Sequence, residues 1–225
     1  MKGAAVSPRR RPLGPGAEVG SGTRLLLVRH AKAGDRRRAA GPDVLRPLSP
    51  PGRAQAAALV TSLWPLVAPA VDLEQAPARG RAGPLGDGAE RGTGATASRP
   101  QPGTGRVRVY SSPARRCVDT VAPLAGALGV AVAEVPALGE GDAGAALAFV
   151  RGFLETVRAE EPEGEFAVTV ACTHGDILPV TVAALVGEAG GPLPTAPPAA
   201  KASTWVLEWG PDGGLHQATY LAPPG

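Results

Sequence analysis

The sequence alternates between short apolar runs and longer segments of helical periodicity, and this alternation constrains the fold more than any other feature. Runs such as "LLLV" and "FAVTVAC" are typical of strands that are buried on both faces. Between them, apolar residues recur every three or four positions, as they do in amphipathic helices. The pattern therefore predicts an α/β fold: a single three-layer domain with a mostly parallel central sheet and helices on both faces.

The alternation predicts six strands and four helices. We expect the strands at Arg24–His30, Val107–Ser111, Val130–Val135, Phe166–Cys172, Ser203–Trp209 and Leu215–Leu221. We expect the helices at Pro51–Val67, Pro113–Leu128, Ala143–Ala159 and Asp176–Val186. Ser49 is the predicted N-cap of the first helix, and the last two strands should form a hairpin across "GPDGG".

Two segments are rich in Gly and Pro and almost free of large apolar side chains. Residues 1–22, which are also rich in Arg, and residues from about 72 to 105 show no periodicity. We expect both to be disordered, the first as a tail and the second as a surface insertion. The predicted domain therefore spans residues 23–225 and contains the insertion.

The charge is unevenly distributed along the chain. The net charge of +3 arises within residues 1–22, so the remainder is neutral overall and a nucleic-acid partner is not expected. Within that remainder, residues 24–53 carry eight Lys or Arg residues and two Asp residues, a local charge of +6. This local excess favours an anionic ligand near the first strand.

The two cysteines and the apolar runs indicate a soluble cytoplasmic protein. Cys117 and Cys172 are far apart in sequence and lack partners at metal-ligand spacing, so we expect reduced, buried thiols and no metal site. The "LLLV" run is too short to span a membrane, and no apolar segment follows the N-terminal arginines.

Cations and imidazoles follow the predicted core strands. The first strand ends in Arg29–His30, Arg115 and Arg116 follow the second in "YSSPARRC", and His174 follows a third in "CTHGDI". Carboxyl ends of parallel strands meet at one edge of a sheet, where such folds bind ligands. Guanidinium groups and helix N-termini bind phosphoryl oxygens, and an imidazole can attack phosphorus. The arrangement therefore predicts a pocket for a phosphoryl group.

Five motifs, in order, resemble the histidine phosphatase superfamily, also called phosphoglycerate mutase-like: "LLLVRHAKAG", "RPLSPPGRAQA", "VYSSPARRCVDTVAPLA", "ALGEGD" and "VACTHGDIL". Within it the chain most resembles the short SixA-like phosphohistidine phosphatases. It is also similar to the phosphatase domain that follows a Nudix domain in some bacterial fusion proteins. The resemblance implies a phosphoglycerate mutase-like fold and a phosphatase that needs no metal or cofactor and works through a phosphohistidine intermediate.

The resemblance also implies roles for individual residues. His30 matches the nucleophile, and Arg29, Arg116 and His174 match the groups that hold the phosphoryl oxygens. Glu140 matches the general acid, although Asp142 in the same Gly-rich loop is a second candidate. The spacing to the family's Thr selects Arg116, which leaves the neighbouring Arg115 as a charge at the rim.

The chain departs from the family pattern at several positions. Ala31 replaces the usual Gly after the nucleophile, a change that SixA-like proteins should tolerate. Lys32, Ala33 and Arg36 stand where mutases carry other residues, so mutase activity is doubtful. The expected substrate is a phosphohistidine protein or, alternatively, a small phosphorylated metabolite or nucleotide. The remaining alternative is a phosphate-binding module without activity.

Other polar residues are expected to be structural. Ser111, Ser112 and Ser203 are interpreted as hydroxyls at strand edges, Gln55 as part of a helix start, and His216 as a surface histidine. The oligomeric state is left open.

Overall fold

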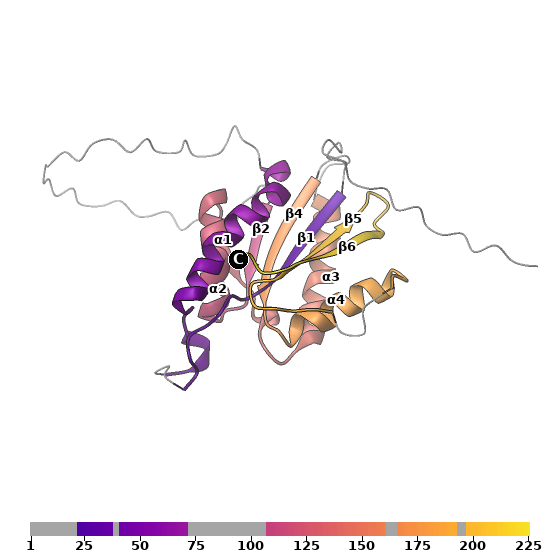
Figure 1. The fold of residues 1–225 in the computed structure, drawn as a ribbon. Helices are drawn as coiled ribbons and strands as arrows, with labels where there is room; N and C mark the ends of the chain where they lie inside the picture. The colour runs from indigo at the N-terminus through magenta and orange to yellow at the C-terminus, as the bar shows by residue number, and fades with distance from the viewer. Residues whose placement is uncertain (1–21, 38–40, 72–106, 161–165, 193–196) are drawn as a thin grey trace, which may run out of the picture.

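A computed structural model describes residues 22–37, 41–71, 107–160, 166–192 and 197–225. The predicted tail and the predicted insertion lie outside these ranges, apart from Gly22, which begins the first strand. The described elements form one α/β domain of three layers (Figure 1).

The central sheet has the strand order β3-β2-β4-β1-β5-β6 among the described residues. Its first four strands are parallel, and β5 and β6 form the predicted antiparallel hairpin at one edge. The strands are β1 Gly22–Arg29, β2 Val107–Ser111, β3 Val132–Glu134, β4 Phe166–Thr173, β5 Thr204–Trp209 and β6 Leu215–Leu221. The sheet is therefore mixed but mostly parallel, as the sequence predicts.

Helices cover both faces of this sheet (Figure 1). The helices α1 and α2 pack on one face, and α3 and α4 pack on the other. Their bounds are α1 Pro50–Val67, α2 Arg115–Leu128, α3 Ala143–Glu160 and α4 Ile177–Glu188. The described residues also form short 3-10 helices, which are η1 Asp43–Leu45, η2 Ala68–Ala70 and η3 Pro136–Leu138. None of the helices in the described part of the chain is long and apolar enough to cross a membrane.

The β1 strand shows why the apolar runs become buried strands. Leu26 and Val28 point into the core under α1 and α2, whereas Leu25 and Leu27 point into the core under α3 and α4. All four side chains are at most 1% exposed. Burying each of them stabilises the fold by roughly 1.5–3 kcal/mol, so this strand belongs at the centre of the sheet.

Several element boundaries differ from the predicted ones. The α2 helix begins at Arg115, two residues after its predicted start at Pro113. The reason is that Ser112 stays bound to β4 through Cys172 O, and its Oγ accepts the N–H of Ala114, which forms a bend before the helix. The β3 strand is shorter than predicted because it pairs only with the last three residues of β2.

The start of α1 is fastened to the chain that leaves β1. Ser49 is the N-cap, as predicted: its Oγ accepts the N–H of Gly52 at 3.2 Å and donates to Lys32 O at 2.9 Å. A Cβ at residue 52 would lie 1.9 Å from Lys32 O, so only glycine permits this close approach. The residues that follow β1 are thereby held firmly against α1.

Candidate active site

The two histidines that end core strands lie side by side. Residues Arg29 and Thr173 are paired across β1 and β4, and His30 N donates to Thr173 O at 2.9 Å. His174 directly follows this pair, and the ring centroids of His30 and His174 are 5.3 Å apart. The convergence predicted from the strand ends is therefore present in the structure.

The environment of His30 keeps its imidazole neutral. Its Nδ1 lies 2.8 Å from Ala31 O, and because a carbonyl only accepts hydrogen bonds, Nδ1 carries the proton. Burial lowers the pKa of His30 from 6.5 to about 4; the Ala31 hydrogen bond opposes this, and the charges of His174, Arg116 and Arg29 add to it. At neutral pH the Nε2 atom therefore holds a free electron pair.

We expect the imidazole of His30 to titrate near pH 4 in the free protein. The measurement is a pH titration of the histidine ring resonances by NMR, in which the His30 signal is identified by its loss in His30→Asn. The shape of that curve reports one proton leaving as pH rises through the pKa. A midpoint at about pH 6 or above would contradict the account of a buried, neutral His30.

Arg116 is buried at the centre of the site, at 2% exposure. Its Nη2 lies 2.8 Å from Oε1 of Glu140 and 3.4 Å from Nδ1 of His174, and its Nη1 donates to Asp43 O at 2.9 Å. Its Nε is buried and has no partner among the described residues. This unpartnered donor is available to an incoming anion.

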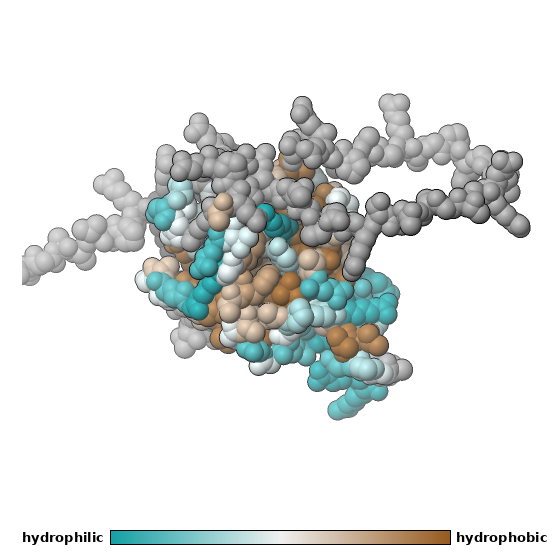
Figure 2. Space-filling model, turned by 180° about the vertical axis from the view of Figure 1, so that it is seen from behind, coloured by the Kyte–Doolittle hydropathy of each residue, from teal (hydrophilic) through white to brown (hydrophobic). Residues whose placement is uncertain are grey.

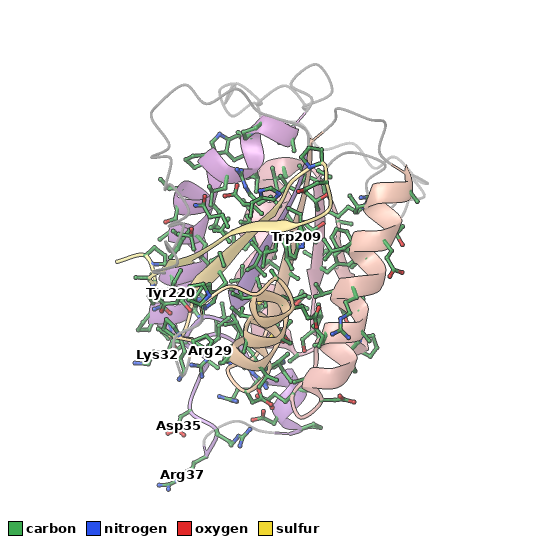
Figure 3. All side chains as sticks on the ribbon, turned by 90° about the vertical axis from the view of Figure 1, so that its right-hand side faces the viewer. Arg29, Lys32, Asp35, Arg37, Trp209 and Tyr220 are labelled. Carbon is green, nitrogen blue, oxygen red and sulfur yellow. The ribbon has the colours of Figure 1, made fainter. Side chains whose placement is uncertain are left out.

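Arg29 offers a second unpartnered donor. Its Nη1 donates to Ala199 O, and its Nε is buried without a partner among the residues that the structure describes. Figure 3 shows Arg29 at the end of the sheet where the chain leaves β1 toward Lys32. Two guanidinium groups with free Nε atoms thus lie beside His30, a charge arrangement that suits a phosphoryl group.

Gly175 leaves room for the Arg29 guanidinium, because a Cβ there would lie 2.4 Å from Cζ of Arg29. We expect Gly175→Ala to displace this group and to lower kcat/KM for an aryl phosphate by roughly 100-fold. The control is Gly152→Ala on α3, where a Cβ meets no atom within 4 Å. Steady-state kinetics test this, and a Gly175→Ala variant within about threefold of wild type would contradict the role of Arg29.

The two candidate acids lie in different places. Glu140 is in the site: its Oε1 is 3.1 Å from Nδ1 of His174, and its side chain is 44% exposed. Asp142 instead accepts the N–H of Ala145 at 2.8 Å, as a cap of α3. Arg115 is exposed and lies 3.6 Å from Asp119 on its own helix. Of the two acids, Glu140 is the one that contacts the buried cation of the site.

Several of the described residues contact the site although the sequence analysis did not assign them to it. Oγ of Ser112 is 2.9 Å from Nε2 of His174, so this serine is more than a strand-edge hydroxyl. Thr120 accepts the N–H of Ala31 at 2.9 Å and donates to Arg116 O at 2.6 Å. It thereby links the chain that follows His30 to the first turn of α2. Asp43 contacts Arg116. The position of Ser112 directly after β2 was the signal that could have identified it.

The thiols lie behind the site. Cys117 Sγ is 3.4 Å from Nε2 of His174, and both cysteines are buried and free, as expected. Burial raises the pKa of the Cys117 thiol, but hydrogen bonds with Cys172 and His174, and the charges of His174 and Arg116, outweigh this and lower its pKa to about 6. Burial raises the pKa of Cys172.

Three side chains of the site could also ligate a metal. Each of these side chains offers one ligand atom, and the three atoms lie within 4.8 Å of one another; the residues are His30, Glu140 and His174. However, the Arg116 guanidinium already lies against the Glu140 and His174 atoms of this group. A cation in the same place would face that positive charge at close range, so the arrangement suits an anion better.

Comparisons with known proteins agree with the motifs and the fold. The model of the histidine phosphatase superfamily (branch 1) matches residues 84–149. An 8-oxo-(d)GTP phosphatase of Mycolicibacterium smegmatis is 31% identical over 200 residues, which are 89% of this chain and 48% of that protein. The chain thus spans about half the length of this relative.

Solved structures share the fold. The protein histidine phosphatase SixA complexed with tungstate matches with a TM-score of 0.55 at 16% identity, over 90% of this chain and 96% of that one. A mycobacterial glucosyl-3-phosphoglycerate phosphatase matches with a TM-score of 0.52 at 18% identity, over 91% of this chain and 100% of that one. At these identities the likeness concerns the fold alone.

The paired histidines and the guanidinium groups beside them therefore form a candidate site for a phosphoryl group. In sequence the chain is similar to the histidine phosphatase superfamily, and its fold is similar to that of SixA, as the motifs predict.

Proposed function

We propose that the protein is a metal-independent phosphatase in which His30 forms a phosphohistidine intermediate. The observation that carries this proposal is the neutral His30, whose protonated Nδ1 is bound to Ala31 O. Beside it lie the guanidinium groups of Arg29 and Arg116, whose buried Nε atoms have no partner among the described residues. A nucleophile and a preorganised binding site for the phosphoryl oxygens are thereby in one place.

In the first step, Nε2 of His30 attacks phosphorus in line and forms the P–N bond. The bond from phosphorus to the leaving group breaks, and its electron pair departs with that group, which takes a proton from Glu140 when it needs one. Arg29, Arg116 and His174 bind the three phosphoryl oxygens and neutralise the charge that develops on them.

In the second step, water replaces His30 at phosphorus. Glu140, in its carboxylate form, accepts a proton from the water, whose oxygen forms a bond to phosphorus as the P–N bond breaks. The electron pair returns to Nε2, and inorganic phosphate leaves. The position of Glu140, half-exposed and in contact with Arg116 and His174, supports this role at the mouth of the site.

For the substrate, we propose a phosphohistidine protein, in line with the SixA-like motifs. A nucleotide is the second candidate, because the relative at 31% identity is named for activity on 8-oxo-(d)GTP. Imidazole and phosphate are good leaving groups, so both candidates fit a site in which proton delivery is not essential.

The test is turnover in the presence of EDTA, with three substrates compared: an aryl phosphate, a phosphohistidine peptide and 8-oxo-dGTP. We expect EDTA-resistant release of inorganic phosphate, with the highest kcat/KM for the phosphohistidine peptide. A preference for 8-oxo-dGTP would instead select the nucleotide as substrate. Binding of inorganic phosphate without turnover of any substrate would favour a phosphate-binding module.

The role of Glu140 predicts an effect that depends on the leaving group. Glu140→Gln should slow release of an alkyl alcohol by about 100-fold or more, because an alkoxide must be protonated as it leaves. The first step with p-nitrophenyl phosphate should change little. Asp142→Asn is the matched control, and single-turnover kinetics are the measurement. If instead Asp142→Asn slows the alkyl substrate much more than p-nitrophenyl phosphate and Glu140→Gln does not, the general acid is Asp142.

A further inference from the structure

The chain between β1 and α1, of which residues 30–37 and 41–49 are described, contains a polar loop whose described part protrudes from the domain. Its base is closed where Ala33 pairs with Leu48 and Gly34 N donates to Pro47 O at 2.9 Å. In Figure 1 the loop is the dark purple segment at the lower left, below α1 and α2, and in Figure 3 Asp35 and Arg37 lie far out on it. In Figure 2, where it lies at the lower right, teal atoms surround a small brown patch.

This loop is attached to the site by polar contacts rather than by core packing. None of the three residues of η1, which lies on the loop, is buried, and its apolar residues Val44 and Leu45 are 45% and 57% exposed. The contact with the site is made by Asp43, whose backbone carbonyl and carboxylate both bind Arg116.

We propose that Asp43 is a positioning residue, which holds the Arg116 guanidinium so that one edge of it faces the phosphoryl group. Nη1 of Arg116 donates to Asp43 O at 2.9 Å and lies 3.2 Å from Oδ2 of Asp43. Both acceptors on this nitrogen therefore come from Asp43. This inference rests on the proposed function of the site.

The opposite edge of the guanidinium, which carries Nε and Nη2, is the one that faces the rest of the site. Nε and Nη2 lie on the same edge, and Nε of Arg116 is buried with no partner among the described residues. Nη2 is shared by Glu140 and His174. Two parallel N–H donors on one edge of a guanidinium match two phosphoryl oxygens. Because Asp43 binds Nη1 on the other side of the group, it preorganises this edge for the phosphoryl group.

A carboxylate so close to an anion site would ordinarily weaken anion binding, but the charge of Asp43 is compensated on its own loop. Oδ1 accepts from Nε of Arg36 and from Nε of Arg46, each at 2.9 Å, and Oδ2 accepts from Nη2 of Arg36 and of Arg46 at 3.1 and 3.3 Å. The hydrogen bonds from these two arginines hold the pKa of Asp43 far below its ordinary value. The effect of Asp43 on the site is therefore to orient the Arg116 guanidinium rather than to repel an anion.

Positioning and simple electrostatics predict opposite signs for the same variant. Removal of a negative charge beside the pocket should tighten the binding of inorganic phosphate if only Coulomb attraction matters. If Asp43 positions Arg116, its removal should weaken that binding. The sign of the change therefore separates the two explanations without any assumption about the physiological substrate.

The experiment compares wild type with Asp43→Ala, Asp43→Asn and Asp35→Asn. Asp35→Asn is the matched control, since it removes one negative charge from the same loop, where the Asp35 carboxylate accepts the backbone N–H of Arg37. The readouts are the Kd of inorganic phosphate by calorimetry and kcat and KM for an aryl phosphate. Asp43→Asn keeps the shape of the side chain and guards against misfolding of the alanine variant.

We expect Asp43→Ala to weaken phosphate binding by about tenfold and to lower kcat by a similar factor, because the guanidinium bonds strengthen in the transition state. Asp43→Asn should show a smaller effect of the same sign, and Asp35→Asn should stay within about twofold of wild type. We expect the NMR signal of the Arg116 Nε–H to be sharp in wild type and to broaden in Asp43→Ala.

Unchanged or tighter phosphate binding in both Asp43 variants, with kcat unchanged, would overturn the inference. As long as wild type still turns over through His30, that result leaves the proposed function intact. If wild type neither binds inorganic phosphate nor forms a phosphoenzyme, the proposed function fails and the role of Asp43 fails with it.

Discussion

Replacement of His30 by asparagine should abolish turnover and lower kcat by at least about 10⁴-fold, because the side-chain amide cannot form the covalent intermediate. The fold should survive, since among the residues that the structure describes the His30 side chain has a hydrogen bond to Ala31 O only, which is a local contact. Calorimetric phosphate binding should therefore remain measurable in the variant.

The matched control for this variant is His216→Asn. His216 is an exposed histidine of the β5–β6 hairpin that lies 2.7 Å from Asp212, and it stays a surface residue as the sequence predicted. Its variant should keep activity within about twofold of wild type. Activity of His30→Asn above roughly one percent of wild type would show that another group attacks phosphorus.

Loss of Arg116 should have the second largest effect. Arg116→Ala removes a buried cation that lies between Asp43 and Glu140, and it leaves both carboxylates facing the phosphoryl group. We expect kcat/KM to fall by about 10³-fold or more. Arg116→Lys should recover part of this loss, because lysine restores the positive charge but cannot donate two parallel hydrogen bonds to the phosphoryl group.

The neighbouring arginine provides the control. Arg115 is exposed and pairs with Asp119, so Arg115→Ala should stay close to wild type in steady-state kinetics. Thermal unfolding of the three variants separates a loss of fold from a loss of chemistry. Equal losses in Arg115→Ala and Arg116→Ala would show that the site depends on the charge of this helix turn rather than on the buried guanidinium.

The order of strands and helices could be predicted because burial on both faces leaves a clear mark on the sequence. The β1 and β4 runs are almost wholly apolar because each lies between two layers of helices. The boundaries were less predictable. Pro113 is a favourable first residue of a helix, yet contacts of Ser112 with Cys172 and Ala114 delay the start of α2.

The strand-end residues of the site could be predicted in the same way, because a parallel sheet brings its carboxyl ends together. The choice between Glu140 and Asp142 could not, because it depends on a turn at Gly141, whose φ of 93° no other residue type adopts easily. Asp43 could not be assigned either. Its contact with Arg116, 73 positions away, depends on the path of a loop that carries no periodic pattern.

The phosphoenzyme tests the central claim most directly. Glu140→Gln is mixed with p-nitrophenyl phosphate, since its second step should be slow, and the reaction is quenched in alkali, where phosphohistidine survives. Mass spectrometry of the digested protein should then find one phosphoryl group on the peptide that contains His30, removable by acid, and none after the additional change His30→Asn. A phosphoryl group on another residue, or turnover of wild type with no phosphoenzyme at any time, would contradict the mechanism.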